Sequence, residues 1–190
     1  SSFFGQIPGL RLGAVISSTP AAHALERAKG AHIPTYIVER ALFPNNASCC
    51  SALLGKLRDL DTELVVTAGF AEKLNYPLLH FYKNRVIGSQ PALFPAFCGE
   101  NGFDPVHALR ETLRLGLRVS GATAYFFGEE DNGLGPVIAQ KAVPVLPGDT
   151  AASLSERIMR EGEWAVLPEA IRLFCEGRLR VEGDRVTISK

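Results

Sequence analysis

The stretch that most constrains the fold of this chain is Arg85–Gly99, which reads RVIGSQPALFPAFCG. It begins with a short apolar run that is typical of a buried strand, and this run ends at Gly88. Because proline fixes φ and disfavours helix at the residue before it, Pro91 and Pro95 predict a stiff, extended loop. In α/β proteins a strand that ends in such a loop usually ends at the ligand crevice. We therefore expect the functional site in this region.

Apolar strands and amphipathic helices alternate along the chain. Strands are predicted at residues 12–16, 33–38, 64–68, 85–89, 119–127 and 137–145, helices at 21–31, 48–60 and 106–115, and a short helix or turn at 76–82. A long helix capped by Asp149 or Thr150 is expected to run to about Phe174, followed by a hairpin around Gly183-Asp184. This order predicts a doubly wound, mostly parallel α/β sheet with helices on both faces, a C-terminal long helix and a hairpin.

The composition limits the class of protein. The chain has 190 residues, 46% of them hydrophobic and 21% charged, which predicts a single domain over residues 1–190. Equal numbers of basic and acidic residues, with no basic run, argue against a nucleic-acid partner. No apolar stretch is long enough to span a membrane and no signal segment opens the chain, so a cytoplasmic protein is expected. The cysteines have no zinc-ligand spacing, so no metal is expected.

Several motifs occur in the same order as in one known family. Residues 85–99 resemble R-[VI]-[IL]-N-I-H-P-S-L-L-P-x-[FY]-x-G, the signature of glycinamide ribonucleotide formyltransferases. Residues 14–35 and 64–74 are similar to that family's A-V-I-S-N…G-I-P-T and L-V-V-L-A-G-F-M-R-I-L segments. Residues 121–127 (GATAYFF) resemble G-A-T-V-H-F-V, and residues 135–145 resemble G-P-I-I-x-Q-x-A-V-P-V. The resemblance covers nearly the whole chain and implies the formyltransferase variant of the doubly wound fold.

The resemblance also implies a reaction, the transfer of a formyl group from 10-formyltetrahydrofolate to the amine of glycinamide ribonucleotide in purine biosynthesis. Such a reaction needs donors aimed at a tetrahedral oxyanion and a group that moves protons. The family assigns this work to an asparagine, a histidine and an aspartate. Here Gly88 stands at the asparagine position and Gln90 at the histidine position. Glycine has no side-chain donor, and glutamine cannot carry a proton near neutral pH.

The third catalytic position is also changed. The loop GEEDNGLGP looks one residue longer than the family's, so Asn132 or Gly133 takes the place of the aspartate, with Asp131 close by. His107, in a segment like the family's G-x-H-V-H, is a further candidate base. An active enzyme would have to use Gln90, Asp131 or His107 in new roles.

The folate side of the family's site is better kept in this chain. Backbone contacts survive side-chain changes, so a pocket for 10-formyltetrahydrofolate or a folate analogue is one expectation, and a packed strand end without a ligand is the other. The residues that match the family there are Ala68, Gly69, Phe70, Leu74, Gly135 and Pro136.

The family opens with a strand and a glycine-rich loop, G-x-G-[ST]-N-L, which holds phosphate on backbone N–H groups at a helix N-terminus. The resemblance begins after that segment, since Ser1–Gly9 looks like the tail of the family's first helix. A strand from inside the sheet would then be missing and its neighbours left unpaired. The sequence is compatible with three explanations: the chain is a fragment, a partner fills the gap, or the sheet is rearranged.

Taken together, the sequence favours a degenerate formyltransferase homologue with little or no transfer activity and a remaining role in binding a folate-like ligand or a protein partner. Fold alone does not carry function, and the site residues argue against the parent chemistry. One alternative is an active formyltransferase with substituted catalytic residues. Another is a non-catalytic subunit that pairs with an active paralogue in a hetero-oligomer, and a homo-oligomer is equally open.

Overall fold

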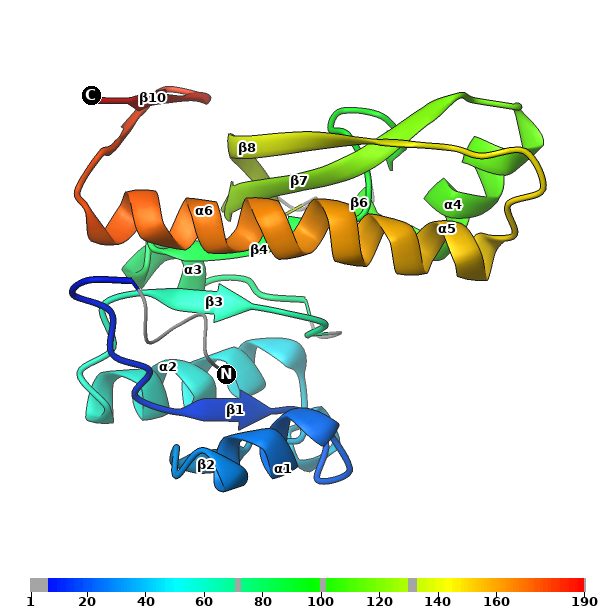
Figure 1. The fold of residues 1–190 in the computed structure, drawn as a ribbon. Coiled ribbons are helices and arrows are strands. Elements are labelled where there is room, and N and C mark those ends of the chain that lie inside the picture. The colour runs from blue at the N-terminus through cyan, green and yellow to red at the C-terminus, as the bar shows by residue number, and fades with distance from the viewer. Residues whose placement is uncertain (1–6, 71–72, 100–101, 130–132, 190) are drawn as a thin grey trace.

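A computed structural model of the chain describes residues 7–70, 73–99, 102–129 and 133–189, and it has the predicted alternation of strands and helices (Figure 1). Its elements are β1 (Val15–Ser17), α1 (His23–Gly30), β2 (Thr35–Ile37), η2 (Arg40–Leu42), α2 (Asn46–Asp59), β3 (Val65–Thr67), α3 (Leu78–Phe81), β4 (Val86–Gln90), β5 (Cys98–Gly99), β6 (Gly102–Phe103), α4 (Pro105–Arg114), β7 (Val119–Phe127), β8 (Leu134–Pro144), α5 (Ala151–Arg157), η3 (Ile158–Glu163), α6 (Trp164–Cys175), β9 (Leu179–Glu182) and β10 (Arg185–Ile188). Within the described ranges, no helix has the length and apolar character that a membrane crossing requires.

The main sheet has the strand order β3-β4-β7-β8. β3 and β4 are parallel, whereas β7 is antiparallel to both of its neighbours. Three of the four strands therefore run in one direction and only β7 is reversed, so the predicted mostly parallel sheet is confirmed for strand direction. β9 and β10 form the predicted terminal hairpin.

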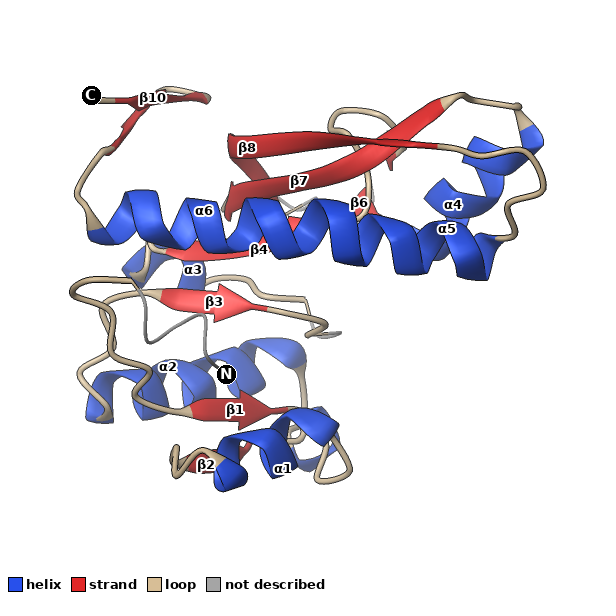
Figure 2. Ribbon diagram, viewed as in Figure 1, coloured by secondary structure: helices blue, strands red, loops and turns tan. Residues whose placement is uncertain are grey.

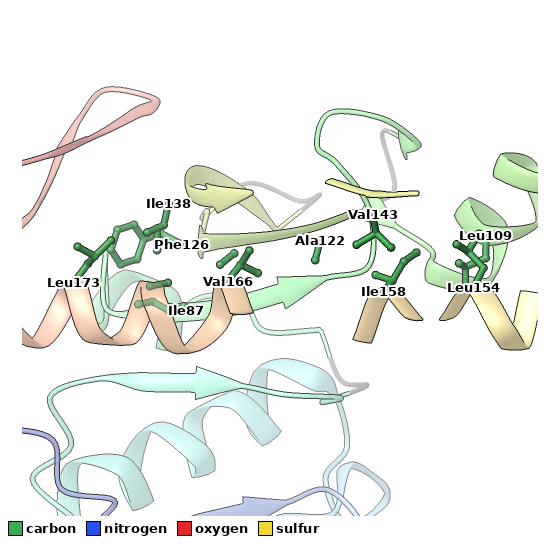
Figure 3. Close-up of a cluster of buried hydrophobic side chains, with 12 residues drawn as sticks. Ile87, Leu109, Ala122, Phe126, Ile138, Val143, Leu154, Ile158, Val166 and Leu173 are labelled. Atoms are coloured by element: carbon green, nitrogen blue, oxygen red, sulfur yellow. The ribbon is translucent and has the colours of Figure 1, made fainter. Parts of the chain in front are cut away.

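Helices cover both faces of this sheet (Figure 2). Ile87 of β4 belongs to a core cluster with residues of β7 and the long C-terminal helix, among them Phe126 and Ile158 (Figure 3). The preceding residue, Val86, belongs to a second cluster with residues of α2 and α3, among them Leu53. Because successive side chains of a strand point to opposite faces, β4 buries apolar side chains on both sides, as its sequence predicted.

The predicted long helix is present, and its middle is wound as a π-helix. It begins at a capping box in which Thr150 and Ser153 satisfy each other's backbone N–H groups. Residues 158–163 then form the π-helical segment η3 before α6 continues to Cys175. Gly162 lies against β7, and a Cβ atom there would stand 2.8 Å from the Cβ of Ala122. The wide turn and this glycine together let the helix approach the sheet closely.

A break divides the strands at one side of the molecule. Within the described part of the chain, β1 pairs only with β2, and β3 pairs only with β4. β1 and β3 point in the same direction (Figure 1). The unpaired neighbouring strands expected from the sequence are therefore present, and the two sheets are separate.

The N-terminus of the long helix is fixed by a shielded ion pair. Arg157 approaches both carboxylate oxygens of Asp149 at 2.6 Å, and the exposed fractions of the two side chains are 17% and 4%. Leu146 N–H and the Ser153 hydroxyl also donate to this carboxylate. The arginine hydrogen bonds are the main reason that the pKa of Asp149 lies well below its ordinary value of 3.8.

This lowered pKa predicts a loss of stability in acid. A carboxyl group whose pKa is depressed in the folded state stabilises the fold above its ordinary pKa, and that contribution is lost as pH falls below about 3.8. We expect Asp149→Asn to lower the melting temperature at pH 7, and the gap to the wild type to narrow as pH falls from 5 to 2. Thermal scans across that range test it, with Asp184→Asn in the terminal hairpin turn as the control. A gap that stays constant with pH would contradict the assignment.

Candidate functional site

The proline loop after β4 is held by a buried threonine. Thr123 of β7 lies opposite Gln90 in the strand register and is fully buried. Its hydroxyl donates to the Ala92 carbonyl oxygen at 2.6 Å and accepts the Phe94 N–H at 3.0 Å. The Gln140 side-chain amide donates to this hydroxyl at 2.9 Å and to the Phe94 carbonyl oxygen at 3.0 Å. Three hydrogen bonds thus reach the loop at the end of β4, and a fourth joins the two side chains that hold it.

Gly88 and Gln90 lie two residues apart and therefore on the same face of β4, opposite Tyr125 and Thr123. The Gln90 side chain is hydrogen-bonded to Tyr125, which is almost completely buried. Burial raises the pKa of Tyr125 to about 12, although the hydrogen bond from Gln90 acts in the opposite direction. Both partners are therefore uncharged near neutral pH. This position of the strand offers a neutral hydrogen-bonding pair and no proton carrier.

The remaining candidates for catalysis lie away from the end of β4 or outside the described residues. His107 is exposed on the first turn of α4, where Asp104 caps its backbone N–H and Glu111 is a charged neighbour. Asp131 and Asn132 lie outside the described residues. Gly133 is described, with φ of 68°, and its carbonyl oxygen accepts the Gly128 N–H in the turn between β7 and β8.

The six residues of the predicted folate side divide into two groups. Ala68 and Gly69 are exposed just after the carboxyl end of β3, beside the end of β4. Phe70 and Leu74 instead pack in the second core cluster. Gly135 and Pro136 are the second and third residues of β8, and a Cβ atom at Gly135 would collide with the Phe126 carbonyl oxygen. Ala68 and Gly69 are thus the pair whose backbone is accessible, and Gly135 has a packing reason of its own.

One functional candidate was missed by sequence reasoning. The Ser89 hydroxyl donates to the Glu163 carboxylate at 2.8 Å, on the face of β4 that carries Ile87. Burial is the main cause of a raised pKa for Glu163, and the serine hydrogen bond opposes it. The two residues are 74 positions apart, so no local pattern joins them. The available signal was Ser89 itself, which stands where the resembled signature has isoleucine.

The loop that follows β7 is tied to α3. Glu129 is within 3.2 Å of His80 Nδ1 and 3.3 Å of Lys83 Nζ. The hydrogen bonds from these two side chains lower the pKa of Glu129. All three side chains are well exposed, so these contacts contribute little stability.

A cavity of about 240 Å³ lies beside the residues that directly precede β7, and none of the predicted site residues lines it. Its walls come from Leu113, Gly116, Leu117, Arg118, Val145, Leu146, Gly148 and Asp149. In the part of the chain that the structure describes, no three His, Cys, Asp or Glu side chains are grouped in a way that could hold a metal ion.

Comparison with known proteins identifies the family. The formyl transferase family model matches residues 9–171. The phosphoribosylglycinamide formyltransferase of Haemophilus influenzae is 32% identical over 95% of this chain and 81% of its own length. The chain belongs to the formyl transferase family, and within it to the phosphoribosylglycinamide formyltransferase group.

Two further relatives show how much of the fold and of the chain length is shared. The crystal structure of glycinamide ribonucleotide transformylase 1 from Symbiobacterium toebii is 40% identical, has a TM-score of 0.88, and aligns over 98% of this chain and 84% of its own. The formyltransferase-type fold predicted from the sequence is thereby confirmed. The trifunctional purine biosynthetic protein adenosine-3 of Bos taurus is 34% identical over 90% of this chain, which spans only 16% of that protein's length.

The hydroxyl of Thr123 predicts a test of the loop anchor. Thr123→Val keeps the shape of the side chain but leaves the Ala92 carbonyl and the Phe94 N–H without this partner. An unsatisfied buried polar group costs about 1–3 kcal/mol, so the melting temperature should fall by roughly 3–10 °C. Thr187→Val, at an exposed position of β10, is the matched control and should change it by less than about 2 °C. An equal effect of the two changes would contradict the anchor.

Glu163 predicts a pH effect of opposite sign to that of Asp149. Because its pKa is raised in the folded state, the wild type loses stability as pH rises from the ordinary value of 4.5 through the raised pKa. Glu163→Gln keeps an acceptor for Ser89 and cannot ionise. The melting temperature of this variant should therefore rise relative to that of the wild type as pH increases from 4.5 to 8. The control is Glu111→Gln, which replaces a carboxyl with a lowered pKa, so the wild type should lose stability relative to this variant as pH falls into the acid range. A pH-independent difference for Glu163→Gln would overturn the assignment.

Proposed function

We propose that this chain is a ligand-binding member of the phosphoribosylglycinamide formyltransferase group that transfers formyl groups little or not at all. It forms one formyltransferase-like domain over residues 1–190, and a folate-like molecule is the ligand that its retained residues support best. The name of the Haemophilus relative supplies the parent reaction, and the substitutions in this chain argue that the reaction is lost.

The single observation that carries the proposal is the neutral state of the β4 end. Gly88 is buried and has no side chain, and Gln90 is engaged by Tyr125. Neither can supply the side-chain oxyanion donor and the proton carrier that formyl transfer to an amine needs. Losing an oxyanion donor costs roughly 10²–10³ in rate, and losing a general acid or base costs about 10²–10⁴. The two losses need not multiply, because residues that act as a unit are not additive.

The folate side supports binding rather than catalysis. Ala68 and Gly69 present exposed backbone at the end of β3, next to the anchored proline loop. Ligands of doubly wound sheets bind outside the carboxyl ends of the strands, which is where these residues lie. A flat heterocycle with several donors and acceptors, such as a pterin, suits backbone N–H and C=O groups that do not depend on side-chain identity.

The alternative of an active formyltransferase would need Gln90, Asp131 or His107 in new roles. Of these, Gln90 cannot titrate near neutral pH and His107 lies on the exposed first turn of α4.

The alternative of a non-catalytic subunit draws on a different observation, the break between β1 and β3 in the described residues. An unpaired strand edge is a surface on which another chain can add a strand. A stable hetero-oligomer on sizing and mass measurement would favour that role.

Thermal titration tests the binding proposal. With 5-formyltetrahydrofolate, a stable formyl folate, at about one hundred times its dissociation constant, folding should gain roughly 2.7 kcal/mol. This gain corresponds to a rise in melting temperature of about 5–11 °C for a domain of this size. The p-aminobenzoyl-glutamate portion, which lacks the pterin ring, should give a much smaller rise.

A matched pair of variants locates the site. Ala68→Asp places a charge at the exposed end of β3 and should reduce the ligand-induced rise, whereas Ala21→Asp, at an exposed position before α1, should leave it intact. No rise in the wild type up to millimolar ligand would refute the folate-binding proposal. A rise that both variants preserve would place the ligand away from β3.

A further inference from the structure

Gly88 is enclosed in a way that its sequence position does not reveal. A Cβ atom built on this residue would stand 2.6 Å from Cε2 of Phe127 and 2.6 Å from Oγ1 of Thr67, and 3.3 Å from Cζ of the same phenylalanine. Separations below 3.0 Å are essentially never found for real Cβ atoms. The backbone of Gly88 is an ordinary strand with negative φ. Space, and not backbone conformation, therefore excludes a side chain here.

The ring of Phe127 reaches this place across the β4–β7 strand pair. Gly88 is opposite Tyr125, and Phe127, two residues further along β7, lies on the same face at the diagonal position. Aromatic side chains at such diagonal positions are long enough to reach across a strand pair. The Phe127 ring stacks on that of Tyr125 with centroids 5.1 Å apart and packs against the second core cluster. It is thus a held ring and not the loose end of a flexible side chain.

Thr67 is the lesser obstacle. It lies on β3 directly opposite Gly88, and only its hydroxyl comes close. A threonine can change its χ1 rotamer at modest cost, and its hydroxyl could hydrogen-bond an introduced amide. A phenylalanine ring that is stacked and packed has no equally cheap movement. Phe127 is therefore the residue that decides what position 88 can carry.

We infer that Phe127 and Gly88 are a matched pair in which the phenylalanine ring closes the position of the missing catalytic donor. The resembled motifs pair a large polar residue with a small apolar one, asparagine in the β4 signature and valine in G-A-T-V-H-F-V. This chain has the reverse, glycine on β4 and phenylalanine on β7. The larger side chain is therefore on β7 in this chain and on β4 in the resembled motifs. Restoring the asparagine at position 88 alone would overfill the space that the Phe127 ring occupies.

The exchange also changes which group the site accepts. Where a side-chain amide would donate a hydrogen bond to a ligand oxygen, the chain presents the hydrocarbon edge of a ring. The ring edge has only weakly positive C–H groups, so it would stabilise a developing oxyanion much less than an amide N–H does. The pair therefore leaves a tetrahedral oxyanion without a side-chain hydrogen-bond donor at this point. The fit of the Phe127 ring to Gly88 is tested without any assay of folate binding or formyl transfer, whereas its effect on a ligand oxygen rests on the proposed function.

A double-mutant cycle in melting temperature tests the pairing. Gly88→Asn alone should lower the melting temperature by roughly 4–10 °C, because overpacking a filled site costs about 1–3 kcal/mol. In a Phe127→Val background the same change should cost clearly less, with a coupling of roughly 2–8 °C between the two positions. Gly88→Ala provides a second cycle that adds only the Cβ atom, and it carries the test if Gly88→Asn does not fold.

Two controls make the coupling specific. Phe94→Val removes a ring that contacts Tyr125 in a tilted arrangement and contributes none of the three atoms nearest the Gly88 Cβ position, so it should not rescue either glycine variant. Gly55→Asn, at a helical position with nothing within 4 Å of its Cβ, should change the melting temperature little in any background. Additive losses in both cycles, or equal rescue by Phe94→Val, would overturn the inference. A crystal structure of Gly88→Asn/Phe127→Val with the introduced amide in the vacated ring space would support it directly.

Discussion

The pairing of β4 with β7 is the contact on which the rest of the site depends. It places Gly88 opposite Tyr125 and Gln90 opposite Thr123. From this register follow the neutral Gln90–Tyr125 pair, the Thr123 hydroxyl that anchors the proline loop, and the ring that encloses Gly88. A slip of one residue would turn each of these side chains to the other face of the sheet. Among the described strands of the main sheet β7 alone is reversed, so its antiparallel pairing sets the geometry on both sides.

The two faces of β4 have different chemistry. On the face shared with α2 and α3, the residues at the strand end are uncharged and partly aromatic. On the face shared with the long helix, Ser89 holds the Glu163 carboxylate, which the π-helical turn brings toward the sheet. π-helical turns are frequent at functional sites, and this one is fitted to the sheet through Gly162. Glu163, a carboxylate, thus lies on the face of β4 opposite to that of Gly88 and Gln90.

The regular elements were predictable because their signals are local. β7 has the limits expected from its apolar sequence, Val119–Phe127, and the capped long helix and terminal hairpin occur where their caps and turn residues indicated. The enclosure of Gly88 was not predictable, because it depends on the cross-strand register that brings Phe127 and Thr67 beside it. The Ser89–Glu163 contact joins residues 74 positions apart and depends on a π-turn that has no sequence signature. The predicted roles of Asp131 and Asn132 stay predictions, since both lie outside the described residues.

We propose that the β4 end no longer supports formyl transfer, and a transfer assay tests this proposal most directly. Single-turnover transfer from 10-formyltetrahydrofolate to glycinamide ribonucleotide would be measured side by side for this chain and the Haemophilus influenzae relative. The loss of one oxyanion donor and one proton carrier predicts a rate at least about 10²–10³-fold lower for this chain. A rate within about tenfold of the relative's would contradict the account and show that other residues supply both functions.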